Sequence, residues 1–210
     1  NLDIFPKIRI LSSITMKSTE IHIHQTPDAV LKTICKEVPT SDISTLKIKT
    51  ILAEMSQALR ESGDGVAIAA PQIGQLVRIF VVAGGIMDHV NNYHGEHTSP
   101  DKVFINPEIV KTGKVKKAMK GEGCLSVRYV YGTTKRSDKA TVKALDENGK
   151  EFVMSASGLL AQIFQHEIDH LDGVLFIDHA HDIREMSDDE KQNYRIELNR
   201  LREERMSEYN

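Results

Sequence analysis

Segments with helical periodicity lie towards both ends of the chain, and a block of short strand-like runs separates them. Apolar residues recur at helical spacing over residues 43–62 and 157–171, whereas residues 77–155 carry short runs rich in β-branched side chains. Helices that flank a block of strands are typical of an α+β domain. We therefore expect mixed or antiparallel sheets wrapped around a central helix at 157–171, followed by a C-terminal helix.

Turn-forming residues set the bounds of the expected elements. Thr26-Pro27-Asp28 favours a short helix over 29–38, because Pro suits the first helical turn. Gly63-Asp64-Gly65 ends the helix over 43–62, and Asp146-Glu147-Asn148-Gly149 is typical of a hairpin turn. The strands that we expect cover residues 77–82, 103–105, 108–113, 139–145 and 151–155.

The remaining segments divide the chain into three parts. We expect residues 1–20 to be an extension that is disordered or foreign to the natural protein, and residues 21–181 to form the main domain. Residues 182–210 are expected to form an amphipathic helix, and its apolar face is marked by Tyr194, Leu198 and Leu201. Residues 84–102, rich in turn formers, are expected to form a surface loop.

The charge and the cysteine content exclude several classes of protein. A formal net charge of −3 offers no basic surface for nucleic acid, and no apolar run reaches the ~18 residues that a membrane-spanning helix needs. Two cysteines cannot form a disulfide framework. Asp3, Pro6 and Arg9 interrupt the apolar residues of the N-terminus, which lacks the core of a secretory signal. We expect a cytoplasmic protein, and a monomer.

Two histidines and a glutamate on the central helix carry the clearest chemical signal. His166 and His170 are four residues apart, so both imidazoles lie on one helical face and can bind the same metal ion. Glu167 lies beside them, where its carboxylate can take a proton from a metal-activated water and deliver it to a leaving amine. The pattern predicts a metal-dependent hydrolase.

A catalytic metal site of this kind needs a third protein ligand. One class of peptidase has a histidine six residues after the second one, but Phe176 occupies that position. Glu185 and Glu190 remain weak alternatives, as in a zinc endopeptidase with a downstream carboxylate ligand. Cys124 is the remaining soft ligand, and the glycines on both sides of Glu122 in the same segment permit close approach of the backbone.

Small residues from Gly65 to Gln72 form a third motif. The segment lacks the glycine spacing and the Lys-Ser/Thr pair of a phosphate-binding loop. Alone, it is equally consistent with a tight connection packed against a sheet.

Together, the three motifs resemble the peptide deformylase family, over a span from about His22 to Asp178. The signature of that family is a glycine-rich stretch that ends in Ala-Ala-x-Gln, then Glu-Gly-Cys-Leu-Ser, then Gln-His-Glu-x-x-His. In this chain the motifs end at Gln72, span 122–126 and span 165–170. Three motifs in this order are far more specific than any one of them.

The resemblance implies a hydrolase that removes the formyl group from the N-terminal N-formylmethionine of newly synthesised polypeptides. The implied ligands of one divalent metal are Cys124, His166 and His170. The native metal would be Fe²⁺, which Zn²⁺ or Ni²⁺ can replace. Metal-bound hydroxide would attack the formyl carbon with Glu167 as general acid/base, and the Gln72 amide and the Leu125 backbone N–H would stabilise the oxyanion. Nascent formylated polypeptides are the implied partners, and a transient contact with the ribosome stays open.

Further positions follow from the same resemblance. The residues that it places around the substrate are Gly65, Val66, Ala67, Gly123, Gln162 and Ile163, together with His166. Arg136 matches a family arginine that would support the metal site through Asp169 or Glu122. A solvated arginine at the end of a strand fits the sequence of this segment equally well.

Two departures from the family pattern concern the substrate side. Ala67 stands where a second glycine is usual, which narrows the freedom of the backbone. Arg128-Tyr129 stands where a Pro-Gly-like turn is common. A binding protein that kept the fold and lost turnover is therefore an alternative.

The other histidines are interpreted as structural. His22 and His24 alternate along an expected strand. His89, His94 and His97 lie in the expected loop, where no rigid element fixes their spacing for a second metal site.

Overall fold

The computed structural model describes residues 21–90 and 99–207. The extension expected over residues 1–20, and His94 and His97 of the expected loop, lie outside the described residues. No described helix is both long and apolar enough to span a membrane.

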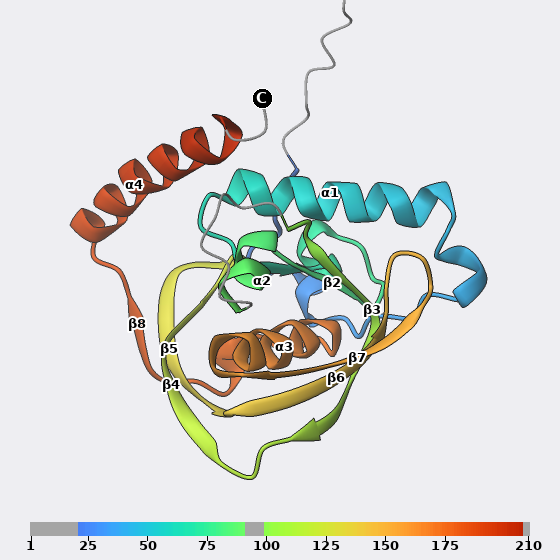
Figure 1. Ribbon diagram of the computed structural model, residues 1–210. Coiled ribbons are helices and arrows are strands. Elements are labelled where there is room, and N and C mark those ends of the chain that lie inside the picture. Colours follow the sequence, from blue (N-terminus) through green and yellow to red (C-terminus); the bar gives the residue numbers. More distant parts are fainter. Residues whose placement is uncertain (1–20, 91–98, 208–210) are drawn as a thin grey trace, which may run out of the picture.

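The named strands form two antiparallel sheets. A five-stranded sheet has the order β1-β2-β3-β6-β7, and a three-stranded sheet has the order β4-β5-β8. The bounds in the first sheet are Ala67–Ala69 for β1, Ile79–Val82 for β2, Lys102–Thr112 for β3, Lys139–Leu145 for β6 and Glu151–Ser157 for β7. Those in the second are Lys116–Cys124 for β4, Val127–Ser137 for β5 and His181–Glu185 for β8. The two sheets wrap around the central helix α3 (Gly158–Leu171), which confirms the predicted fold class (Figure 1).

The side chains of β2 show why helices cover both faces of the five-stranded sheet. Successive residues of a strand point to opposite faces. Phe80 therefore packs on the side of α3, where Phe80 and Phe104 stack with ring centroids 4.4 Å apart and Phe164 of α3 lies against both. Ile79 and Val81 pack on the opposite side, in a second core with α1 (Leu46–Ser62). All four residues of β2 are buried, so this strand carries no polar face.

The helix α1 forms as the sequence predicts. Its first turn is capped by the Thr45 hydroxyl, which accepts a hydrogen bond from the Ile48 N–H. Its end is set by Gly63, whose φ of +82° favours a residue without a side chain. The face that was expected to be apolar is buried through Ile48, Ile51, Met55, Ala58 and Leu59, with Leu52 partly buried.

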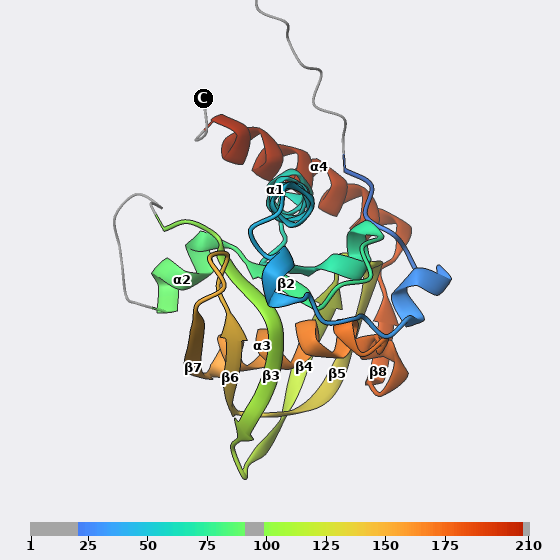
Figure 2. The same ribbon diagram turned by 90° about the vertical axis from the view of Figure 1, so that its right-hand side faces the viewer.

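The C-terminal helix α4 (Asp188–Ser207) crosses α1 (Figure 2), and its Leu198 and Arg202 side chains lie against Gly63. Leu198, one of its predicted apolar residues, is buried. The tail expected to be a helix from residue 182 begins instead with β8, because residues 181–185 pair with β5. The division into a main domain over 21–181 and a tail over 182–210 stays a prediction.

Several expectations from the local sequence were wrong. The helix expected over 29–38 is a single 3₁₀ turn, η1 (Ala29–Lys32), which is capped by Asp28. Residues 21–25, which include His22 and His24, adopt irregular structure instead of a strand. The first part of the expected loop forms the helix α2 (Gly84–Val90), which carries His89.

The strands were also incompletely predicted. The two runs expected over 103–105 and 108–113 are one strand, β3, with a register shift between Ile105 and Glu108. The sequence patterns did not predict β1, β4, β5 or β8. Other short 3₁₀ turns are η2 (Thr40–Asp42), η3 (Ala70–Ile73) and η4 (Phe176–Asp178).

Candidate metal centre and adjoining cavity

The two histidines of α3 meet Cys124 at the end of β4. One helical turn separates His166 and His170, whose ring centroids are 5.0 Å apart. The Cys124 Sγ lies 3.1 Å from the His170 Nε2, and one donor atom from each of the three residues lies within 4.8 Å of the others. A thiolate with two imidazoles is a donor set that suits Zn²⁺ or Fe²⁺. Three ligands also leave a coordination position for water or substrate.

A buried carboxylate orients the first histidine. The Glu122 Oε1 lies 2.8 Å from the His166 Nδ1, so a proton on Nδ1 is shared with Glu122 and the Nε2 remains for a metal. Glu122 also accepts hydrogen bonds from Thr134, Gln162 and Arg136. Burial opposes its ionisation, but the hydrogen bonds from Arg136 and His166 prevail and hold the pKa of Glu122 well below its ordinary value.

Arg136 is the centre of this buried support. It is 5 % exposed, and its Nη2 lies 2.6 Å from the Glu122 Oε1, while its Nη1 lies 2.9 Å from the Asp169 Oδ2. It thus contacts both residues that the sequence offered as partners, and it is not a solvated residue at the end of a strand. Because Asp169 precedes His170 on α3, one guanidinium links β4 to the histidine helix.

The surroundings shift the pKa values of the two histidines in opposite directions. Burial, together with the nearby His166 and Arg136, lowers the pKa of His170 well below its ordinary value, which favours the neutral imidazole that metals bind. Burial would also lower the pKa of His166, but hydrogen bonds to Cys124 and Glu122 raise it well above the ordinary value.

Glu167 is a buried acid that faces the cavity. It is 4 % exposed, and its Oε2 has no hydrogen-bond partner among the described residues. Burial raises the pKa of Glu167 to about 7, despite the opposing effect of His166. A buried polar atom without a partner calls for a ligand or a water molecule. Glu167 therefore has the position and the proton affinity of a general acid/base.

Gln72 directs its amide N–H group towards the candidate metal ligands. It lies on η3 and is 1 % exposed. Its Oε1 accepts a hydrogen bond from the Ala69 N–H at 2.8 Å, which turns the Nε2 towards the Ser126 Oγ at 3.1 Å and the Cys124 Sγ at 3.6 Å. The segment of small residues thus places an amide donor beside the candidate metal ligands. Leu125 follows Cys124 and lines the cavity.

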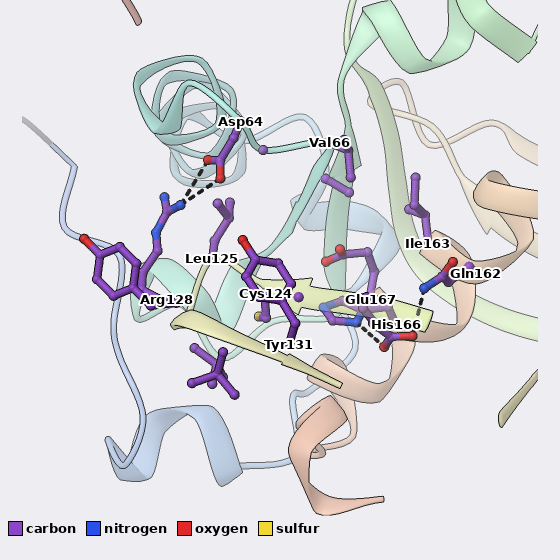
Figure 3. Close-up of a pocket in the computed structure, with 18 of the residues that line it drawn as sticks. Asp64, Val66, Cys124, Leu125, Arg128, Tyr131, Gln162, Ile163, His166 and Glu167 are labelled. Carbon is purple, nitrogen blue, oxygen red and sulfur yellow. Dashed lines mark hydrogen bonds and ion pairs between the residues drawn. The ribbon is translucent and has the colours of Figure 1, made fainter. Parts of the chain in front are cut away.

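A cavity of about 360 Å³ adjoins these residues. Figure 3 shows Glu167, His166 and Gln162 towards one end and the paired Asp64 and Arg128 towards the other. Every residue that was expected around the substrate lines this cavity, namely Gly65, Val66, Ala67, Gly123, Gln162, Ile163 and His166. The cavity lies between β1 and β4, and each of these is the first strand in the order of its sheet.

Ala67 and Arg128, which depart from the family pattern, lie in different surroundings. Ala67 is buried in the core against α3 and also reaches the cavity. Arg128 forms an ion pair with Asp64 at 3.0 Å. Tyr129 adopts a φ of +67°, and its ring lies edge-on to Tyr194 of α4 with centroids 5.8 Å apart.

Some residues of the cavity were not identified from the sequence. They are Asp64, Lys120, Gly121, Val127, Val130, Tyr131, Leu159 and Tyr194. Tyr194 was identified only as part of the apolar face of the C-terminal helix. An aromatic side chain with a hydroxyl group is suited to a binding site, which was the one signal in the sequence. Tyr194 approaches the cavity only because of the way α4 crosses α1.

The alternative third ligands lie elsewhere. Glu185 is exposed on β8 and pairs with Lys191, and Glu190 is partly exposed on α4 and pairs with Arg184. Neither belongs to the cluster of Cys124, His166 and His170. The arrangement expected for a zinc endopeptidase with a downstream carboxylate ligand is therefore not formed.

Comparisons with known proteins show which proteins this chain is similar to. The sequence profile of the family described as Polypeptide deformylase matches residues 21–186. Peptide deformylase 1 of Clostridium perfringens is 43 % identical over 152 residues, which cover 72 % of this chain and 92 % of that protein. The peptide deformylase of Dehalococcoides mccartyi strain CBDB1 is 37 % identical over 157 residues, which cover 75 % and 84 %.

Solved structures show the same similarity. The peptide deformylase of Synechococcus elongatus, in complex with actinonin, superposes with a TM-score of 0.68 at 32 % identity, and the match covers 88 % of this chain and 86 % of that one. A peptide deformylase from Legionella pneumophila gives a TM-score of 0.64 at 35 % identity, with 88 % and 96 % covered.

Proposed function

The chain belongs to the polypeptide deformylase family, and from this we propose that Cys124, His166 and His170 hold the divalent metal of a deformylase. As a member it is a hydrolase that removes the formyl group from N-formylated polypeptides. The observation that carries the proposal is the convergence of these three side chains with the buried Glu167 beside one cavity.

The residues present fit such a metal. We propose Fe²⁺ as the native ion, with Zn²⁺ or Ni²⁺ as replacements, because a thiolate and two imidazoles suit all three ions. When bound, a divalent ion lowers the pKa of a coordinated water from 15.7 towards ~7 and so supplies a nucleophile at neutral pH. The carboxylate of Glu167 faces the cavity, and its Oε2 has no partner among the described residues. This supports a metal-bound water beside it.

Glu167 moves the proton in the proposed reaction. A pKa of about 7 allows its carboxylate to accept a proton from the attacking water and then to donate it to the amino group that leaves. Burial excludes competing solvent from this step. Glu122 and Arg136 hold His166 in the tautomer and orientation that the site needs.

Gln72 and Leu125 stabilise the charge that develops on the formyl oxygen. The Ala69 N–H holds the Gln72 Oε1 and so orients the Nε2 towards the site before the reaction, and one N–H turns from Cys124 or Ser126 to the formyl oxygen. We propose that the backbone N–H of Leu125 is the second donor.

The peptide lies along the cavity between β1 and β4. Edge strands have unpaired backbone groups, to which an extended peptide can add as a further strand. We propose that Gly65, Val66, Ala67 and Gly123 contact the backbone of the peptide, and that Gln162 and Ile163 contact its methionine side chain. We further propose that the protein acts on nascent polypeptides in the cytoplasm as a monomer.

An anaerobic assay of formyl-Met-Ala-Ser, with metal analysis of the same sample, tests the proposal. The wild type should bind about one metal ion per chain and release formate. Cys124→Ala should lose both the metal and the activity, whereas Cys35→Ala, which removes a thiol outside the site, should keep both. Metal binding and turnover in Cys124→Ala would contradict the ligand assignment. An absence of formate from the metal-loaded wild type would instead support the alternative of a binding protein without turnover.

A further inference from the structure

The C-terminal helix supplies part of the cavity wall. The family profile ends at residue 186, and α4 begins at Asp188, yet Tyr194 lines the same cavity as Cys124 and Glu167. An element beyond the matched region therefore contributes to the site at which the reaction is proposed to occur.

Tyr194 is fixed by polar contacts with two other segments. Its hydroxyl donates a hydrogen bond to the Asp64 Oδ2, in the connection between α1 and β1. The Arg128 Nη1, at the start of β5, lies 3.0 Å from both oxygens of Asp64 and 3.2 Å from the Tyr194 hydroxyl. The side chains of Arg128 and Asp64 are 20 % and 27 % exposed, so this ion pair is only partly open to solvent. Burial opposes the charge on Arg128, but Asp64 and Tyr194 raise its pKa.

The packing of α4 on α1 holds Tyr194 in this place. A Cβ atom on Gly63 would lie 2.9 Å from the Arg202 Cγ and 3.0 Å from the Leu198 Cδ1, so α4 approaches the backbone of Gly63 directly. Leu198 is one turn beyond Tyr194 on α4 and is buried. The position of Tyr194 thus depends on a packed helix and not on a loop.

Tyr131 connects this group to the metal end of the cavity. A Cβ atom on Gly123 would lie 2.8 Å from the Tyr131 Cε1, so this ring covers the backbone next to Cys124. Figure 3 shows Tyr131 between Cys124 and the Asp64–Arg128 pair. The cavity therefore continues from the metal ligands, past Tyr131, to Asp64, Arg128 and Tyr194.

A formylated amino terminus can extend in only one direction from the reaction centre. The formyl group must lie at the metal. The residues after the methionine must therefore occupy the part of the cavity that is remote from the metal. We propose that Tyr194 is a specificity-determining residue, which contacts the peptide chain downstream of the formylmethionine, and that Asp64 positions it. This inference rests on the proposed function. It predicts that the Tyr194 hydroxyl strengthens the preference for formylated peptides of three or more residues over formylmethionine amide.

Steady-state kinetics of the metal-loaded, full-length protein test this inference. The substrates are formyl-Met-Ala-Ser and formyl-Met amide, and the measured quantity is the ratio of their kcat/KM values. In Tyr194→Phe, which keeps the ring and removes the hydroxyl, the ratio should fall about 3- to 10-fold, as for the loss of one hydrogen bond. The change should lie in the KM of the tripeptide and not in its kcat, because contacts remote from the reacting bond act in the ground state and the transition state alike.

Two further variants make the result decisive. Asp64→Asn should also lower the ratio. In the double variant the ratio should fall by less than the product of the two single-variant decreases, because the two residues act as a unit. Ile196→Ala, at a 61 % exposed position on the same helix, should leave the ratio unchanged. A ratio within 2-fold of wild type in Tyr194→Phe, or an equal loss for both substrates, would overturn the inference. Turnover of formyl-Met amide by the wild type tests the proposed function separately.

Discussion

Glu167 combines nearly complete burial with an ionisable carboxyl group beside three candidate metal ligands. We predict that Glu167→Ala keeps about one metal ion per chain but loses at least ~100-fold in kcat/KM, which is the typical contribution of a general acid/base. The loss should be this large because the Oε2 of Glu167 has no other partner among the described residues that could relay the proton. Metal analysis and formate release from the same sample measure both quantities.

Glu185→Ala is the matched control for this variant. Glu185 is exposed on β8 and was one of two alternative ligands, so its removal should change neither metal content nor turnover. Turnover close to wild type in Glu167→Ala would exclude Glu167 as the acid/base, and loss of metal in Glu185→Ala would restore the alternative of a downstream carboxylate ligand.

Residues whose chemistry depends on local spacing could be predicted from the sequence. His166 and His170 needed only the period of a helix to be placed together. The role of Arg136 stayed open, because its burial depends on the pairing of β4 with β5 and on the distance of β5 from α3. Tyr194 was missed as a residue of the cavity for the same reason, since a tertiary contact 130 residues apart in sequence joins it to Asp64.

At the scale of elements, periodicity predicted α1 and α3 well and the strands unevenly. The run that forms β4 is rich in lysine and glycine, which are depleted in strands, so its local preference opposes the observed structure. Pairing with β5 prevails, with register shifts around Glu122. The glycines at the start of α2 similarly suggested a loop, and tertiary packing overrides their low helix propensity.

The crossing of α4 over α1 makes a prediction about stability. Gly63→Ala should lower the free energy of unfolding by ~1–3 kcal/mol more than Gly158→Ala does. Both glycines have positive φ, at +82° and +59°, but a Cβ on Gly158 meets no atom within 4 Å, whereas one on Gly63 meets α4. Urea unfolding of both variants isolates the cost of crowding α4. Equal losses would show that α4 does not press on Gly63 in solution.

At the scale of the whole molecule, the site depends on parts that lie far apart in the sequence. β1 and η3 supply Ala67 and Gln72, β4 supplies Cys124, α3 supplies the histidines, and α4 supplies Tyr194. The helix α3, which carries the histidines, contacts β1 of one sheet and β5 of the other, so it joins the two sheets beside the cavity.

The two thiols of the chain should report separately on the site and on global unfolding. Cys35 is 4 % exposed, packs in the core with α3, and donates its backbone N–H to the Leu171 carbonyl. Burial raises the pKa of Cys35 to about 11, so its reactive thiolate is scarce at pH 8. Cys124 is partly buried and lines the cavity.

We therefore predict that an aromatic disulfide reagent at pH 8 modifies one thiol quickly in the metal-free protein, and the second only when denaturant unfolds the core. Added Zn²⁺ should slow the first reaction, because a bound ion holds the Cys124 thiolate, and it should leave the slow thiol unaffected below the unfolding transition. Cys124→Ala should abolish the fast phase, and Cys35→Ala should abolish the slow one. Two fast thiols in the native protein would contradict the buried position of Cys35, and a fast phase that is insensitive to Zn²⁺ would contradict metal binding at Cys124.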